Sequence, residues 1–176
     1  VIDFLETGGY PAICWPLTVA ANEGGGFTGY LAAQASAEDD ACQVYPAQSD
    51  DLSTWTLLDR PVIEGGTDSY DQMGVVSADI VRLDGKDYLF YVGFAAWEDH
   101  VTYRTASQLT LSLATSDNGI SWKKHGDNPL LVGGTELGQV SAVAAQVVGE
   151  RIHLWVTDFY PELDRSAVGY FLFEPG

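Results

Sequence analysis

Basic residues, methionine and long apolar runs are scarce in this sequence, and these shortages exclude several classes of protein. Eight Lys and Arg stand against 25 Asp and Glu among 176 residues, which gives a formal net charge of −17. Such a field repels nucleic acid and anionic membranes. Although 46% of the residues are hydrophobic, no run is long enough to span a bilayer. The composition therefore predicts a soluble globular chain with one sizeable core.

Motifs that bind cofactors are also missing. No His and Cys spacing resembles a zinc site, and no Gly-rich phosphate loop or nucleophile elbow occurs. We expect no cofactor; a calcium ion in a central channel is compatible with so acidic a chain, but no ligand spacing requires it. The two cysteines, Cys14 and Cys42, fall on strands that are not expected to be neighbours, which favours buried free thiols over a disulfide.

The sequence does contain a repeat, and the repeat predicts the fold. Copies of one apolar segment begin at Cys14, Val76 and Val140 with nearly equal spacing, and segment 60–67 returns at 128–135. Self-similarity at a fixed period is typical of repeat architectures. About four short strands per copy, with turn residues between them, indicate a β-propeller blade. We therefore predict an all-β propeller of four-stranded antiparallel blades, with strands named A to D in chain order.

The repeat divides the single predicted domain, 1–176, into three blades. Blade 1 is expected at about 12–58, blade 2 at about 74–132 and blade 3 at about 139–173. The strands of blade 2 are expected at 74–83, 86–94, 108–115 and 120–125, with a long loop over 95–107. Blade 3 stops after strand C, and segment 1–7 resembles the strand D that it lacks.

Three blades do not close a ring, since propellers usually have four to eight. Two alternatives stay open. In the first, two chains form a homodimer of six blades, and each N-terminal strand completes the partner's third blade. In the second, the chain is a piece of a longer propeller. The complementary ends favour the dimer. A start at Val1 fits a processed secreted protein or a trimmed segment, and slightly favours an extracellular or periplasmic location.

A turn motif between strands C and D supports the propeller. Segment 115–122 fits the Asp-box pattern, and segment 48–55 is a worn copy that keeps Asp50. We expect the Asp carboxylate, Asp117 in the full motif, to accept backbone N–H groups of the turn. The tryptophan that ends each copy is expected to pack between blades. The motif is structural rather than catalytic, because C–D turns lie on the outer rim.

Blade 2 resembles a blade of the five-bladed glycoside hydrolases, the arabinanase-, levansucrase- and invertase-like groups of families 43, 32 and 130. The resemblance is carried by segments 84–93, 114–122 and 128–131, and it extends loosely to the other two blades. It implies a five-bladed type of propeller, a carbohydrate ligand and hydrolysis of a glycosidic bond. These motifs specify the blade more than the chemistry.

The chain departs from that family where the family places its catalytic carboxylates. At the start of strand A it has Trp15-Pro16, Ser77-Ala78 and Ser141-Ala142. Hydrolysis requires two carboxyl groups roughly 5–10 Å apart. Asp79 and Glu136 are the predicted base and acid. The structural alternatives are a hydrogen-bonded carboxylate for Asp79 and a turn-capping or solvated one for Glu136.

Ligand-binding side chains are expected on the face formed by the D–A and B–C loops, which share one end of the blades because successive strands alternate in direction. Aromatic faces stack on sugars, while carboxylates and Arg bind hydroxyl groups. The residues expected there are Trp97, Glu98, His100, Arg104, Tyr70, Asp71, Asp158 and Tyr160. The sequence thus predicts a glycan-binding propeller that hydrolyses its ligand, or else a non-catalytic glycan-binding or assembly propeller that has lost the family carboxylates.

Overall fold

The computed structural model describes residues 12–22, 24–34, 41–64, 70–99, 104–107, 109–132, 139–160 and 165–175, with the backbone alone at 12–16, 97–99, 104–107, 139, 159–160 and 165. Every element in these ranges is a β-strand. The strands are β1 (Ala12–Ala21), β2 (Phe27–Gln34), β3 (Cys42–Ser49), β4 (Thr56–Leu57), β5 (Gly74–Leu83), β6 (Lys86–Phe94), β7 (Ala96–Asp99), β8 (Arg104–Ser107), β9 (Thr110–Ser116), β10 (Lys123–Lys124), β11 (Leu131–Val132), β12 (Gln139–Val148), β13 (Arg151–Tyr160) and β14 (Arg165–Phe173). No helix that could cross a membrane occurs within these ranges.

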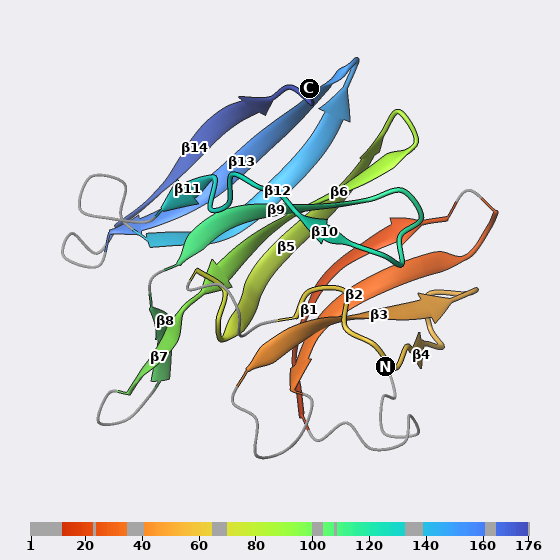
Figure 1. The fold of residues 1–176 in the computed structure, drawn as a ribbon, viewed down its shortest axis with the longest axis horizontal. Coiled ribbons are helices and arrows are strands. Elements are labelled where there is room, and N and C mark those ends of the chain that lie inside the picture. Colours follow the sequence, from red (N-terminus) through yellow and green to blue (C-terminus); the bar gives the residue numbers. More distant parts are fainter. Residues whose placement is uncertain are drawn as a thin grey trace.

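The strands form three antiparallel blades that follow one another along the chain (Figure 1). Blade 1 contains β1–β2–β3 with β4 on its outer edge, and blade 3 contains β12–β13–β14. Blade 2 contains β5–β6–β9, and both β10 and β11 pair with β9. The all-β, blade-repeat architecture is therefore the one that the sequence predicts. Strands β5 and β6 begin and end at the expected residues, and β1 and β12 begin where blades 1 and 3 are expected to begin.

The turn between β5 and β6 shows why the sequence locates these strands so sharply. Asp84 and Gly85 both adopt positive φ, 51° and 77°. Two consecutive residues with positive φ are what a two-residue hairpin turn requires, and Asp-Gly meets that requirement at little steric cost. The turn sets the register that pairs Leu83 with Lys86 and places alternate residues of β6 on opposite faces of the blade.

The connection between strands B and C of blade 2 differs from the predicted loop. It contains a two-stranded hairpin, β7–β8, in which Trp97 pairs with Ala106 and Asp99 with Arg104. The two strands pair with each other and form a sheet separate from the blade. Because the hairpin does not lie across the main core, its sequence lacks the apolar alternation that identifies a half-buried strand.

Strand D of blade 2 is also more divided than predicted. Between the short strands β10 and β11, the side-chain amide of Asn128 pairs with the backbone of β9 in place of a strand residue. Its Oδ1 accepts a hydrogen bond from the N–H of Leu113 at 2.9 Å, and its Nδ2 donates to the C=O of Leu113 at 2.9 Å. One asparagine side chain therefore satisfies both backbone groups of a residue in β9, as a neighbouring strand would.

The core lies between the blades rather than within a single layer. Blade 2 packs on blade 3 through a cluster that includes Phe90, Leu113, Ile152 and Leu154, all buried. Phe173 of blade 3 meets Phe90 edge to face, with ring centroids 5.4 Å apart. A second cluster joins blade 1 to blade 2. Its buried members are Tyr30, Val44, Ile63, Val75, Ala78, Leu89, Tyr91 and Ala114.

The free-thiol prediction is wrong, because Cys42 is disulfide-bonded. The sequence predicted free thiols because Cys14 and Cys42 fall on strands that are not neighbours within the blade. Cys42 is instead the first residue of β3, at the end of the blade, where β3 makes a single parallel bridge to Gly74 of β5. The approach is so close that a Cβ on Gly74, whose φ is +114°, would lie 1.9 Å from the carbonyl oxygen of Cys42. Disulfides persist in oxidising compartments.

The C–D turns close as predicted but use a different residue. In blade 2 the Oδ1 of Asn118, not Asp117, accepts the N–H groups of Ile120 and Ser121, at 2.9 and 2.8 Å. In blade 1 Asp51 takes the same place, with Oδ1 accepting two N–H groups at 2.8 and 2.7 Å. The acceptor lies one residue later than the motif suggested, because Ser116 and Ser49 accept the preceding N–H groups of each turn. Those hydrogen bonds are Asn118 and Gly119 N–H to Ser116 Oγ, and Asp51 and Leu52 N–H to Ser49 Oγ.

The predicted N-terminal strand, 1–7, lies outside the described residues. In the part of the chain that the structure describes, β14 pairs with β13 alone and forms the outer edge of blade 3. The expected exchange of the N-terminal strand between two chains therefore stays a prediction.

Candidate functional site

The D–A and B–C connections lie at one end of the blades, as their place in the topology requires. Gly74 at the start of β5 pairs with Phe94 at the end of β6, and Val140 near the start of β12 pairs with Asp158 near the end of β13. The hairpin β7–β8, which carries Trp97, Glu98 and Arg104, follows β6 at this same end. We call this the loop end of the blades.

The described side chains at the loop end centre on an ion pair between a buried carboxylate and a partly exposed lysine. Asp71 has no exposed surface, and its Oδ2 lies 2.8 Å from Nζ of Lys124. Tyr91 donates its hydroxyl to the same oxygen at 2.9 Å. Lys124 also donates to the backbone oxygen of Glu64 at 3.2 Å. The pair thus joins strand D of blade 2 to the loop that precedes its strand A and to its strand B.

A glycine makes this arrangement fit. A Cβ on Gly93 would lie 2.8 Å from the Cβ of Asp71 and 3.0 Å from the backbone oxygen of Tyr70. Only a glycine in β6 lets the loop approach the strand so closely. Thr110 then donates its hydroxyl to the oxygen of Tyr70 at 3.2 Å. The loop is therefore held against two strands of blade 2.

Electrostatics at this cluster keep Tyr91 protonated. Burial is the main cause that raises the pKa of Tyr91 far above its ordinary value, and the nearby charge of Asp71 raises it further. Tyr91 is therefore a hydrogen-bond donor to Asp71 rather than a base. Lys124 lies 5.7 Å from the centroid of the Tyr70 ring, so the half-buried Tyr70 packs beside the cation.

Asp79, the predicted base, lies in the middle of β5 and holds three strands together. Its Oδ1 accepts from Thr18 Oγ1 at 3.0 Å and from the N–H of Ile80 at 2.8 Å. Its Oδ2 accepts from the N–H of Ala145 at 2.8 Å. Three donors, one from strand A of each blade, therefore bind the carboxylate. Asp79 thus has the contacts of a hydrogen-bonded structural carboxylate, the alternative to a catalytic base.

The remaining predicted site residues divide into those with a described position and those without one. Glu136 and His100 lie outside the described residues. The backbones of Trp97, Glu98, Arg104 and Tyr160 are placed at the loop end, in β7, β8 and β13. Asp158 is partly buried there, and its Oδ1 is buried without a hydrogen bond from any described group. The structure brings Tyr70 and Asp71 together, while Asp79 lies farther along β5.

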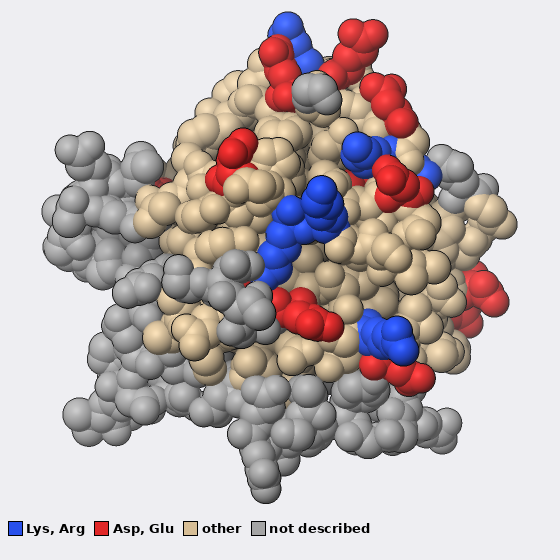
Figure 2. Space-filling model, viewed as in Figure 1, with Lys and Arg blue, Asp and Glu red and all other residues tan. Residues whose placement is uncertain are grey.

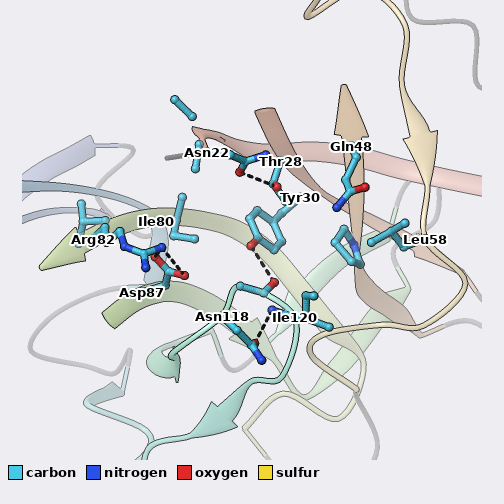
Figure 3. A pocket seen from close by; sticks show the side chains of 15 residues that line it. Asn22, Thr28, Tyr30, Gln48, Leu58, Ile80, Arg82, Asp87, Asn118 and Ile120 are labelled. Atoms are coloured by element: carbon cyan, nitrogen blue, oxygen red, sulfur yellow. Dashed lines mark hydrogen bonds and ion pairs between the residues drawn. The ribbon is translucent and has the colours of Figure 1, made fainter. Parts of the chain in front are cut away.

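A described cavity lies at the opposite end of the blades, beside the A–B and C–D turns (Figure 3). Its volume is about 280 Å³, between blades 1 and 2. Within it Tyr30 donates to the oxygen of Gly119 at 3.3 Å, and Arg82 pairs with Asp87 at 3.2 Å. These polar groups are directed at each other rather than at an open space. Burial, with the charge of Asp87 as a second cause, raises the pKa of Tyr30 well above its ordinary value.

Sequence reasoning missed Lys124 and Tyr91. Lys124 was expected in the outer strand 120–125, far along the chain from Asp71, and Tyr91 was expected in strand 86–94 without a role at the site. One signal was present, because Lys124 is one of only eight basic residues in a chain with 25 acidic ones. On the face shown in Figure 2, basic side chains lie beside acidic ones in small mixed groups, and uncharged surface separates these groups. No group of His, Cys, Asp and Glu suited to a metal ion occurs among the described residues.

Comparison with known proteins identifies the fold. Neither a family model nor a curated protein matches the sequence. Among solved structures, the family 32 β-fructofuranosidase of Bombyx mori in complex with sucrose matches with a TM-score of 0.65 and 16% identity, over 93% of this chain and 34% of that chain. Fructan 1-exohydrolase IIa of Cichorium intybus in complex with 1-kestose matches with a TM-score of 0.68 and 18% identity, over 94% of this chain and 31% of that chain.

The fold is that of the glycoside hydrolase propellers. A family 117 glycoside hydrolase of the marine bacterium Zobellia galactanivorans also matches, with a TM-score of 0.65 and 19% identity, over 94% of this chain and 55% of that chain. The chain thus spans between about a third and about half of the length of these three proteins. At such identities the similarity establishes the arrangement of the blades, and function has to be argued from the site.

Proposed function

We propose that this chain is a carbohydrate-binding propeller segment whose ligand lies at the loop end of the blades. The observation that carries the proposal is the placement of chemically suitable residues there by separate elements. Strands β7 and β8 bring Trp97, Glu98 and Arg104, the end of β13 brings Asp158 and Tyr160, and the loop before β5 brings Tyr70. Aromatic rings with carboxylates and Arg are the groups with which proteins bind sugars.

The solved structures support a carbohydrate ligand, and one further observation supports this end over the opposite one. The solved structures with the same fold include complexes with sucrose and 1-kestose, so the fold accommodates oligosaccharides. In the cavity at the opposite end, by contrast, Arg82 and Asp87 are paired with each other and the Tyr30 hydroxyl is bonded to the backbone. Polar groups that satisfy each other have less to gain from a ligand.

Binding without hydrolysis is the form of the proposal that Asp79 supports. A general base needs an oxygen free to take a proton, and both oxygens of Asp79 accept hydrogen bonds from the protein itself. Its predicted role as base, with Glu136 as acid, stays a prediction. So does direct contact between a ligand and Asp71, whose carboxylate is buried against Tyr91 and Lys124.

The experiment is a calorimetric titration of the chain with neutral oligosaccharides, including sucrose and 1-kestose. We expect saturable binding to at least one of them, which Trp97→Ala weakens by about tenfold or more because a stacking surface is lost. The matched control is Ile120→Ala, since Ile120 is 66% exposed beside the turns at the opposite end. Absence of binding across the panel, or equal loss in both variants, would overturn the proposal.

Hydrolysis is tested separately on any oligosaccharide that binds. Chromatography of the incubated sugar is expected to show no cleavage products. Cleavage that Glu136→Gln and Asp79→Asn each abolish, with binding retained, would instead establish the two carboxyls as the acid and base and contradict the non-catalytic form.

A further inference from the structure

One side chain holds both ends of the D–A loop of blade 2. Nζ of Lys124 lies 2.8 Å from Oδ2 of Asp71 and donates to the backbone oxygen of Glu64 at 3.2 Å. Glu64 and Asp71 stand on either side of segment 65–69 in the sequence, and Lys124 comes from β10, a separate part of the blade. Strand D therefore fixes the loop where it begins and where it ends.

Blade 1 shows that the fold does not need a lysine at this place. Leu57 is the counterpart of Lys124, because each is the second residue after a C–D tryptophan and each pairs with an alanine of strand C. Tyr91 has the counterpart Leu31, which pairs with strand C at the corresponding position. In blade 1 the two leucines belong to one buried apolar cluster, whereas in blade 2 the same positions hold a tyrosine and a lysine bound to Asp71.

Stability does not account for this exchange of apolar for polar groups. Asp71 has no exposed surface, so its ionised carboxylate has lost its contact with water. The cost of removing a charge from water offsets much of the attraction in such a pair, and apolar residues at the same positions often give equal or greater stability. Proteins depart from the locally favoured residue mainly where function requires it. The polar group is therefore better explained by what it places than by what it stabilises.

The side chain that this group places is Tyr70, the residue before Asp71. Lys124 Nζ lies 5.7 Å from the centroid of the Tyr70 ring, and Thr110 donates to the backbone oxygen of Tyr70 at 3.2 Å. The ring is only half-buried, so part of it is exposed at the loop end. An aromatic ring offers a sugar a stacking surface, and a ring held in place before the ligand arrives loses less entropy on binding. Binding by Tyr70 is therefore expected to depend on Lys124.

We propose that Lys124 is a positioning residue of the carbohydrate site. It holds the D–A loop of blade 2 and the ring of Tyr70 in the orientation in which a sugar stacks on that ring. The inference rests on the proposed carbohydrate site at the loop end. It assigns to Lys124 an effect that passes through Tyr70 and needs no contact between Lys124 and the sugar.

The test is a double-variant cycle, measured as affinity for an oligosaccharide that the wild-type chain binds. We expect Lys124→Met to weaken binding about tenfold, and we expect the same change to have little further effect in a Tyr70→Ala background. A lysine that only stabilised the fold would weaken binding equally in both backgrounds. Unchanged affinity of Lys124→Met, or an equal loss with and without Tyr70, would overturn the proposal.

Two controls separate positioning from lost charge and from lost stability. Lys123→Met removes an exposed lysine of the same short strand. Leu57→Ala truncates the buried counterpart in blade 1 and lowers stability away from the loop end. Both are expected to retain the affinity of the wild-type chain, at a temperature at which circular dichroism shows every variant to be folded. A loss of affinity in either control as large as that of Lys124→Met would overturn the proposal.

A second variant keeps the test independent of the folding of Lys124→Met. If that variant does not fold, Thr110→Val replaces it in the cycle, because this change removes only the hydroxyl that binds the oxygen of Tyr70. It is then expected to weaken binding, again with little further effect in the Tyr70→Ala background. Affinity that Thr110→Val leaves unchanged would in that case overturn the proposal.

A measurement without ligand distinguishes failure of this inference from failure of the proposed function. The amide of Gly74 donates to the backbone oxygen of Asp71 at 3.0 Å, so its hydrogen exchange reports on how firmly the loop is held. We expect this exchange to be about tenfold faster in Lys124→Met than in Lys123→Met. An unchanged rate, with binding by the wild-type chain, overturns this inference alone. Absence of binding by the wild-type chain overturns the proposed function on which the inference rests.

Discussion

The Oδ2 of Asp79 in β5 accepts a hydrogen bond from the backbone N–H of Ala145 in β12 at 2.8 Å. This bond ties strand A of blade 2 to strand A of blade 3. Because Oδ1 accepts from Thr18 Oγ1 of blade 1 at 3.0 Å, one carboxylate joins strand A of all three blades. An ionised acceptor makes stronger hydrogen bonds than a neutral one.

Replacing Asp79 is therefore expected to loosen the packing between blades. Asp79→Ala removes three accepted hydrogen bonds and leaves the N–H of Ala145 without its partner, at a cost of about 2 kcal/mol in the free energy of unfolding. The measurement is urea denaturation. Asp127→Ala is the control, since the Asp127 side chain is 91% exposed. Equal stability of the two variants would show that the blades do not depend on Asp79.

The ion pair between the buried Asp71 and the partly exposed Lys124 gives a second prediction. Lys124→Met leaves the Asp71 carboxylate buried without its cation, which is expected to destabilise the fold by about 3 kcal/mol. The double variant Asp71→Asn with Lys124→Met removes both charges and is expected to recover part of that loss. Thermal unfolding of the single and double variants gives the coupling between the residues. Simple additivity would mean that the ion pair contributes nothing of its own.

The C–D turn of blade 2 distinguishes Asn118 from its acidic neighbour. Asn118→Ala removes an acceptor of two backbone N–H groups and is expected to cost about 1 kcal/mol. Asn118→Asp is expected to be tolerated, because Asp51 makes the same bonds in blade 1. Asp117→Ala, the control, is expected to change stability by less than about 0.5 kcal/mol. A larger loss of stability for Asp117→Ala than for Asn118→Ala would show that Asp117 is the acceptor in this turn, as the sequence motif predicts.

Tyr91 predicts how stability responds to alkali. Burial raises its pKa in the folded chain above the value of 10.0 that applies when it is exposed. Its stabilisation is therefore fully present below pH 10 and is lost as the pH rises above it, by about 1.4 kcal/mol per pH unit for one such group. We expect Tyr91→Phe to lower stability at neutral pH and to make the alkaline decline shallower. The check is urea denaturation from pH 8 to pH 11; an unchanged slope would contradict the cause given for the pKa shift.

Much of the fold could be predicted because its determinants are local. The Asp84-Gly85 turn and the apolar strands on either side define β5 and β6 without reference to any other part of the chain. The repeat then transfers that interpretation to β12 and β13. The hairpin β7–β8 was missed because it pairs only with itself and carries no core-facing alternation.

The site was less predictable because its contacts cross between distant segments. The ends of the strands place Trp97, Arg104 and Asp158 at one end of the blades, which the alternation of strand direction foretells. The sequence does not indicate which carboxylate is already engaged by hydrogen-bond donors of the protein itself. The three donors that hold Asp79 come from Thr18, Ile80 and Ala145, and no local pattern of sequence specifies that convergence.

Nuclear magnetic resonance of isotope-labelled protein tests the proposed carbohydrate site most directly. The indole N–H of Trp97 reports on the loop end, and the indole of Trp122, which donates to the oxygen of Gly119, reports on the opposite turns. On addition of an oligosaccharide that binds, the account predicts a saturable shift of the Trp97 signal and an unmoved Trp122 signal. A shift of Trp122 with Trp97 unchanged would place the ligand at the opposite end and contradict the account.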